Sequence, residues 1–410
     1  MTVTGTMHGT ARLLCWAGAD RAGERAARAR VAGALRAGAA VPPAVAGPVR
    51  GAVVVTAPER ALADLAAAPV RQVAAGGPRA LALLLPGQGS QHEGMAAGLY
   101  RAEPVFRAAV DEVLQVWGAE GEAIRADWLG TGAGRGIPVD DGRRSQPLLF
   151  AVDHGLGRLL LSWGVVPAEV LGHSAGEVAA AALAGVFTPA QAAALVRDRV
   201  RAAAVVPPGG MLAVAASPGE LGPYLSGQVA VAAVNAARRT MLAGPRAELA
   251  AVAARLARDG LRLRPVAATL PFHSPAMEPA AAAVERSFAV RPGPARFPVR
   301  SGYTGRLLSA AEAGSARFWA RQLTDPVRFG PALAALLGGG ERLLVECGPG
   351  RVLSSLAARQ PAVRSGRSTV LSLLPGDRPD GVAVLEAAAA LWLEGHDPVP
   401  GSLPGADAGA

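Results

Sequence analysis

Short apolar runs alternate with helix-like stretches from about residue 81 to 205, and this alternation constrains the fold more than any other feature. LALLLPGQGS begins as a buried strand and breaks into a glycine-rich turn, and VVPAEVLGHS leads in the same way into EVAAAALAGV. PAQAAALVRDRVRAAA follows, with Pro189 near a helix start and Gly185 suited to the end of the preceding helix. Strands that alternate with helices predict an α/β fold, in which helices cover both faces of a parallel sheet.

The rhythm changes between residues 206 and 272. Here the order is strand (GGMLAVAA), helix (PGELGPYL), two strands (VAVAAVN and RTMLAG), a long helix (AELAAVAARLARDG) and a last strand (LRLRPVAAT). This βαββαβ order predicts a ferredoxin-like small subdomain. We expect it to be inserted in a large subdomain that comprises residues 81–205 and 273–365.

Two further segments flank these subdomains. Residues 1–80 predict an N-terminal α/β unit: strand ARLLCWAG, a helix from Asp20 to Ala37, strand GAVVVTA, a helix from Pro58 to Ala68, and the linker-like RQVAAGGPRA. This unit has no polar constellation, so we expect a structural role. Residues 366–410 end in SLPGADAGA, a small and polar tail typical of disorder.

The composition excludes several classes of protein. The chain has 410 residues, of which 51% are apolar, and can bury a sizeable core. It has no apolar run of the roughly 18 residues that cross a membrane and no signal peptide, so we expect a cytoplasmic protein without membrane association. Cys15 and Cys347 fit no metal or disulfide spacing, which favours a reducing compartment. The net charge of +9 comes from arginine, without a basic block, which argues against nucleic acid but suits an acidic partner.

The decapeptide LGHSAGEVAA places Ser174 between Gly172 and Gly176, after a strand-like run and before a helix-like one. A Gly-x-Ser-x-Gly element in this setting predicts a sharp elbow that lifts a nucleophilic hydroxyl clear of the sheet, as in α/β-hydrolases. The following helix directs its N-terminal N–H groups at a developing oxyanion. The alternative is an ordinary serine that caps a helix.

A serine nucleophile needs a base, and His273 in ATLPFHSPAM is the better candidate, because it lies where the chain re-enters the large subdomain. His92 in PGQGSQHEGM is possible, and the four remaining histidines are poor candidates. The acidic residues between Ser174 and His273 lie in helical stretches. The sequence therefore predicts a dyad whose imidazole is oriented by a backbone carbonyl rather than by an acid.

Six motifs occur in one order: PGQGSQ, GHSAGE, an arginine-rich helix 25 residues after the serine, NAARRTMLAG, PFHS and ECGPG. On these the chain resembles the malonyl-CoA:acyl carrier protein transacylase family, and more closely the acyltransferase domains of modular polyketide synthases. Residues 11–80 resemble the linker between a ketosynthase and an acyltransferase, and 366–400 the post-acyltransferase linker. No ketosynthase or carrier sequence is present, so the chain is either a discrete trans-acting enzyme, which we expect, or an excised domain.

The resemblance implies a role for each matching residue. Ser174 would be the nucleophile and His273 the general base. The backbone N–H groups of Gln88 and Ala175 would form the oxyanion hole. Arg199, if it is not simply a solvated helix residue, would pair with the free carboxylate of a malonyl-type substrate.

Other positions carry weaker expectations. The main-chain carbonyl of Gln322 would accept the Nδ1–H of the histidine. We interpret Glu177 as a first-turn helix residue rather than a catalytic acid, and Asn235 as a residue that either lines the pocket or holds a turn.

The implied reaction is a ping-pong transfer from malonyl-CoA, through an acyl-serine, to the phosphopantetheine of an acidic acyl carrier protein. It needs no bound cofactor or metal. Residues before the histidine correlate with the α-substituent in this family, HAFH-like with malonyl and YASH-like with methylmalonyl. Here Leu270, Pro271 and Phe272 precede it: the phenylalanine favours malonyl, whereas Leu270 and the small Ala175 leave an unusual unit open.

Three other functions remain open: an acyl-carrier shuttle, an editing hydrolase and a non-catalytic docking protein. Arg199 argues against the first two, and the intact motifs argue against the third. We expect a monomer that contacts the carrier protein, and a ketosynthase or other synthase modules remain open as further partners.

Overall fold

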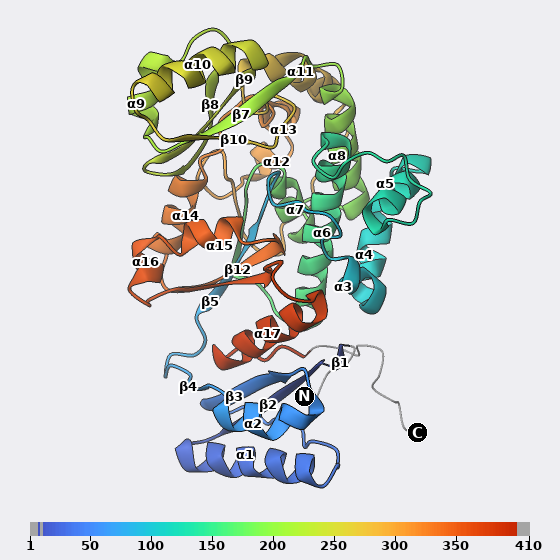
Figure 1. The fold of residues 1–410 in the computed structure, drawn as a ribbon, viewed down its shortest axis with the longest axis vertical. Helices are drawn as coiled ribbons and strands as arrows, with labels where there is room; N and C mark the ends of the chain where they lie inside the picture. Colours follow the sequence, from blue (N-terminus) through green and yellow to red (C-terminus); the bar gives the residue numbers. More distant parts are fainter. Residues whose placement is uncertain (1–6, 9–10, 400–410) are drawn as a thin grey trace.

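The computed structural model describes residues 7–8 and 11–399, so the expected disordered tail lies outside the described residues. The described residues form three sheets, stacked along the longest axis of the molecule (Figure 1). The helices are α1 (Arg21–Arg36), α2 (Ala61–Ala67), α3 (Ala97–Ala102), α4 (Pro104–Gln115), α5 (Ala119–Leu129), α6 (Gly142–Ser162), α7 (Gly176–Leu183), α8 (Pro189–Ala203), α9 (Pro218–Leu221), α10 (Arg246–Arg258), α11 (Glu278–Ser287), α12 (Ala310–Ala313), α13 (Ala316–Arg321), α14 (Phe329–Gly338), α15 (Val352–Ala357), α16 (Pro361–Arg364) and α17 (Asp380–Leu393).

The central sheet is parallel, as predicted, with the order β11-β6-β5-β12-β13. Its strands are β5 (Ala80–Leu85), β6 (Glu169–Gly172), β11 (Val299–Arg300), β12 (Arg342–Pro349) and β13 (Thr369–Leu374). Side chains alternate along a strand, and those of β5 enter two cores. Leu81, Leu83 and Leu85 pack with α4, α6 and α7, whereas Ala82 and Leu84 pack with α14 and α15. Burial on both faces explains the uninterrupted apolar run.

The small subdomain confirms the predicted ferredoxin-like unit. It consists of β7 (Gly209–Val214), β8 (Ala230–Ala236), β9 (Arg239–Pro245) and β10 (Leu263–Val266), with α9 and α10 between strands. The sheet order β10-β7-β9-β8 is antiparallel throughout, and Leu212, Leu242 and Leu256 belong to its own core. The unit lies at the end of the molecule opposite the N-terminal sheet (Figure 1).

The N-terminal sheet is antiparallel, with the order β1-β2-β3-β4: β1 (Met7–His8), β2 (Ala11–Gly18), β3 (Val49–Val55) and β4 (Val70–Gln72). Helices α1 and α2 pack on one face, through Leu14 and Trp16. Helix α17 packs on β2 and β3 and separates this sheet from the central one (Figure 1).

The C-terminal segment is more integrated than a linker. Within 366–410, β13 is an edge strand of the central sheet, and α17 joins that sheet to the N-terminal unit. Arg50 of β3 stacks on Trp392 of α17, with its guanidinium carbon 4.4 Å from the ring centroid. The linker-like RQVAAGGPRA also supplies part of β4 and the first residue of β5. Among the described residues, no helix combines the length and apolarity that crossing a membrane requires.

Candidate active site

The GHSAG elbow connects β6 to α7, and its geometry explains both glycines. Ser174 has φ of 53°, in the left-handed region that side chains rarely occupy. A Cβ on Gly172 would lie 2.3 Å from the backbone nitrogen of Glu177, and one on Gly176 would lie 2.2 Å from the carbonyl oxygen of Leu85. Only glycine therefore allows the turn to close this tightly against β5.

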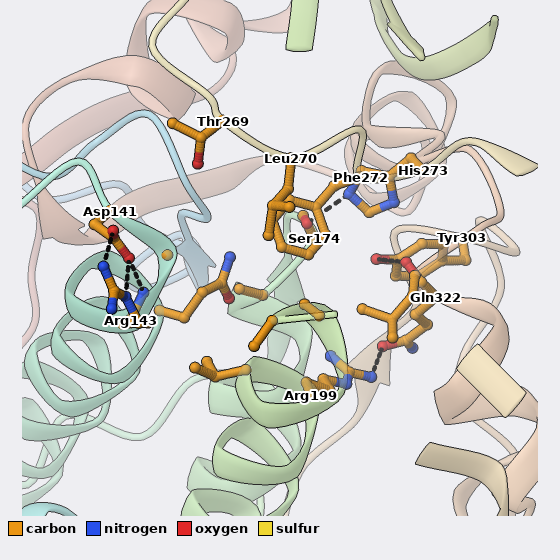
Figure 2. A pocket seen from close by; sticks show the side chains of 17 residues that line it. Asp141, Arg143, Ser174, Arg199, Thr269, Leu270, Phe272, His273, Tyr303 and Gln322 are labelled. Carbon is orange, nitrogen blue, oxygen red and sulfur yellow. Dashed lines mark hydrogen bonds and ion pairs between the residues drawn. The ribbon is translucent and has the colours of Figure 1, made fainter. Parts of the chain in front are cut away.

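Ser174 and His273 are in direct contact. The hydroxyl oxygen lies 2.8 Å from Nε2 of the imidazole, and Figure 2 shows the two side chains facing each other. His273 also has a positive φ, of 65°, and its backbone N–H donates to the carbonyl of Leu323 at 2.7 Å. Burial, followed by the effect of the neighbouring His173, lowers the pKa of His273 to about 3. The imidazole is therefore neutral near pH 7 and free to accept a proton.

The carbonyl that orients His273 is that of Asp325, at 3.1 Å from Nδ1, rather than that of Gln322. Gln322 follows the last residue of α13 and keeps a helical conformation, and its carbonyl accepts the hydroxyl of Tyr303 at 3.2 Å. Of the two carbonyls, that of Gln322 has the smaller effect on the pKa of His273. The expectation of a carbonyl in place of an acid agrees with the structure. The carbonyl of Asp325 makes the hydrogen bond to Nδ1, and the expected carbonyl of Gln322 has a smaller effect on the imidazole.

Two backbone N–H groups are available beside the serine. The PGQGS turn follows β5 and lies against the elbow, since a Cβ on Gly87 would be 3.2 Å from that of Ser174 and 3.3 Å from the nitrogen of Ala175. Within the described residues, the N–H groups of Gln88 and Ala175 donate no hydrogen bond. The Gln88 side chain accepts from Gln146 at 3.0 Å, which holds the turn in place. These two N–H groups fit an oxyanion hole.

Arg199 of α8 is buried, with 8% of its surface exposed, which is the opposite of a solvated helix residue. Its Nη2 donates to the carbonyl of Trp319 at 2.7 Å and to Oε1 of Gln322 at 2.8 Å. Within the described residues it forms no ion pair with a carboxylate, and its Nε has no hydrogen-bond partner. A guanidinium in this state is prepared to bind an anion.

Most of these residues line one cavity of about 230 Å³, but Gln88 and Asp325 are not among its lining residues. Its wall includes Ser174, His273, Arg199, Tyr303 and the side chains of Leu270 and Phe272. Figure 2 shows Asp141 and Arg143 across the cavity from the dyad, paired at 2.7 Å.

Pro271 does not line the cavity, contrary to the expectation from the sequence. Pro271 packs against the start of β7, since a Cβ on Gly209 would lie 2.6 Å from the Cβ of Pro271. Leu270 and Phe272 line the cavity, whereas the residue between them does not.

His173 and Asn235 contact each other through Nε2 and Oδ1, at 2.9 Å, outside the cavity wall. Glu177 is fully buried in the first turn of α7, and burial raises its pKa to about 8. It accepts the N–H of Gly302 at 2.7 Å. Both observations favour structural contacts over acid catalysis.

Sequence reasoning missed Tyr303 and Asp325. Tyr303 follows β11, at the same edge of the parallel sheet as Ser174, but the short strand gave no usable signal. Among the described residues, no group of three or more His, Cys, Asp or Glu side chains could hold a metal ion, and Cys15 and Cys347 are both free and buried.

Known proteins share this architecture. The family described as "Acyl transferase domain" matches residues 83–395. Polyketide synthase GfsA of Streptomyces halstedii is 38% identical over 407 residues, covering 94% of this chain but only 5% of the much longer synthase. The acyltransferase domain from the second module of the salinomycin polyketide synthase has a TM-score of 0.74 and 33% identity, covering 94% of this chain and 84% of that domain. The acyl transferase domain of SpnD, solved in complex with 2-(pent-4-yn-1-yl)malonyl, has a TM-score of 0.80 and 28% identity, covering 95% and 97%. The chain therefore belongs to the acyl transferase domain family, as its motifs predicted.

Proposed function

We propose that this acyltransferase transfers a malonyl-type unit from CoA to the phosphopantetheine thiol of an acyl carrier protein. The observation that carries the proposal is Arg199, a buried guanidinium without a carboxylate partner among the described residues, in the same cavity as Ser174 and His273. A substrate with a free carboxylate supplies the missing partner.

The first half-reaction forms an acyl-serine. His273 Nε2 takes the proton of the Ser174 hydroxyl as its oxygen attacks the thioester carbon, and the N–H groups of Gln88 and Ala175 stabilise the oxyanion. The carbon–sulfur bond then breaks and the CoA sulfur takes the proton from His273. The carbonyl of Asp325 keeps Nδ1 protonated and Nε2 directed at the serine throughout.

The second half-reaction reverses these steps with a different thiol. The carrier's thiol gives its proton to His273 and attacks the acyl-serine ester, and the ester oxygen leaves as the Ser174 hydroxyl. Atoms and charges balance without a cofactor.

Selection of the acyl group follows from burial. A substrate without a carboxylate leaves Arg199 buried and unpaired, which costs several kcal/mol in comparable cases. Phe272 and Leu270 narrow the cavity near the dyad, which favours an unsubstituted malonyl group over a branched one. SpnD was solved with a substituted malonyl group, so a larger unit is the alternative within this class.

The test is the intact mass of the protein after incubation with malonyl-, methylmalonyl- and acetyl-CoA, alone and with a separate carrier protein. We expect a malonyl adduct that is absent in Ser174→Ala and moves to the free carrier, as in a trans-acting enzyme. Rapid release of free acid from varied acyl groups would instead identify an editing hydrolase, and efficient acetyl transfer an acyl shuttle. Absence of any adduct would contradict the proposal.

A further inference from the structure

A chain of buried polar groups extends from the cavity into the core of the large subdomain. Arg199 Nη2 donates to Oε1 of Gln322 at 2.8 Å, and Nε2 of Gln322 donates to Oε1 of Glu177 at 3.1 Å. Arg199 and Gln322 line the cavity, whereas Glu177 does not. Glu177 is therefore out of reach of a substrate and can act only through its neighbours.

The order of donors and acceptors in this chain is fixed by chemistry. A guanidinium can only donate, so the end of the Gln322 amide that faces Arg199 must be its oxygen. The NH₂ end then points away and needs an acceptor, and the Glu177 carboxyl group supplies it. Without that acceptor, the buried NH₂ group of Gln322 would be left unpaired, and this orientation of the amide would be less stable.

Glu177 is itself held firmly. Its other oxygen, Oε2, accepts the N–H of Gly302 at 2.7 Å, and a Cβ on Gly302 would lie only 3.4 Å from that oxygen. It belongs to the first turn of α7, three residues after Ser174. The position of the carboxyl group is thus tied to the same elbow that presents the nucleophile.

These contacts fix the orientation of the Arg199 guanidinium. Nη2 of Arg199 has both its hydrogen bonds inside the protein, to Gln322 and to the carbonyl of Trp319. Within the described residues, Nη1 and Nε make no hydrogen bond. Both N–H groups of Nη2 therefore hold the planar group in place, and Nε is buried, so Nη1 is the nitrogen left to donate to a substrate carboxylate.

We propose that Glu177 and the side chain of Gln322 are positioning residues that orient Arg199 for the substrate carboxylate, and so set the preference for carboxylated acyl groups. The inference rests on the proposed function. It assigns the Gln322 side chain to substrate selection, apart from the dyad, whose imidazole is held by Asp325.

The test compares malonyl and acetyl loading, as initial rates of acyl-serine formation, in the full chain. In Glu177→Gln, the new amide can accept from Gly302 or from Gln322 with its single oxygen, and its NH₂ group favours a flipped Gln322 that turns N–H groups toward Arg199. In Gln322→Met, both side-chain hydrogen bonds disappear while the backbone contact with Tyr303 remains. The matched control is Glu103→Gln, which changes a second buried carboxyl group. Unlike Glu177, Glu103 has no side-chain hydrogen-bond partner within the described residues, and it lies between α3 and α4, outside the cavity wall.

We expect the ratio of malonyl to acetyl kcat/KM to fall by roughly 10- to 100-fold in both variants, in line with loss of an oriented charge-assisted hydrogen bond. The loss should appear as a higher KM for malonyl-CoA, with acetyl loading retained and Glu103→Gln unchanged. The inference would be overturned by a parallel fall in malonyl and acetyl loading rates, or by an unchanged malonyl-to-acetyl ratio in a folded Gln322→Met protein. If the wild-type protein itself shows no preference for malonyl, the proposed function is wrong. The same experiment therefore distinguishes failure of the proposed function from failure of this inference.

Discussion

Replacing Arg199 by alanine tests the carboxylate-binding role most directly. Arg199 is 8% exposed, and within the described residues its Nη1 makes no hydrogen bond, so a bound malonyl group would accept a charge-assisted hydrogen bond from it. Such a bond contributes about 1.5–3 kcal/mol, and water that enters the vacated space would recover part of this. A net loss of about 2 kcal/mol corresponds to a fall in kcat/KM of roughly 30-fold.

The same substitution should leave acetyl loading intact or raise it, because acetyl no longer leaves a buried charge unpaired. The assay is the initial rate of acyl-serine formation from each CoA ester, followed by intact mass. Arg201→Ala is the control, because Arg201 lies on the same helix but is exposed and does not line the cavity. An unchanged malonyl preference in a folded Arg199→Ala protein would remove Arg199 from the site and refute the argument from burial.

Three further predictions concern the dyad and the shape of the cavity. Because the pKa of His273 is lowered to about 3, the imidazole stays neutral from pH 8 down to 5, and the rate of acyl-serine formation should change little over this range. With an imidazole at its ordinary pKa, the rate would fall by about 30-fold between pH 8 and 5. Such a fall would show that burial does not keep the imidazole neutral. Phe272→Ala should raise the ratio of methylmalonyl to malonyl loading several-fold, since it removes a side chain from the cavity wall, whereas an unchanged ratio would place the selection elsewhere. Gly176→Ala should destabilise the protein by roughly 1–3 kcal/mol in urea unfolding, because its Cβ would lie 2.2 Å from a carbonyl oxygen. A variant with unchanged stability would contradict the tight elbow.

Local pattern was sufficient for much of the fold. The elbow around Ser174 and the βαββαβ order of residues 206–272 depend on glycine placement and on apolar periodicity, which the sequence displays directly. The C-terminal segment was harder, because β13 and α17 are recognised as part of the body only once their apolar faces have partners in other sheets. A linker and an edge strand of this length have similar composition.

The site residues likewise differ in whether the sequence could identify them. Ser174, His273 and Arg199 carry side-chain chemistry, so residue type and motif order identified them and the structure brings them into one cavity. Asp325 contributes a backbone carbonyl, which any residue can supply, and only the path of the chain after α13 decides which carbonyl faces the imidazole.

Glu177 shows why a correct local interpretation can still miss a contribution to function. An acid in the first turn of a helix is stabilised by the helix dipole wherever it occurs, so the sequence favoured a purely structural role for Glu177. The structure retains the first-turn position but buries the carboxyl group completely and gives it two donors, Gly302 and Gln322, from segments more than 100 residues away. Burying a carboxyl group costs free energy, and hydrogen-bond partners such as these offset part of that cost. Here the second partner leads to Arg199, so the contacts that make the burial tolerable are the same ones that orient the guanidinium.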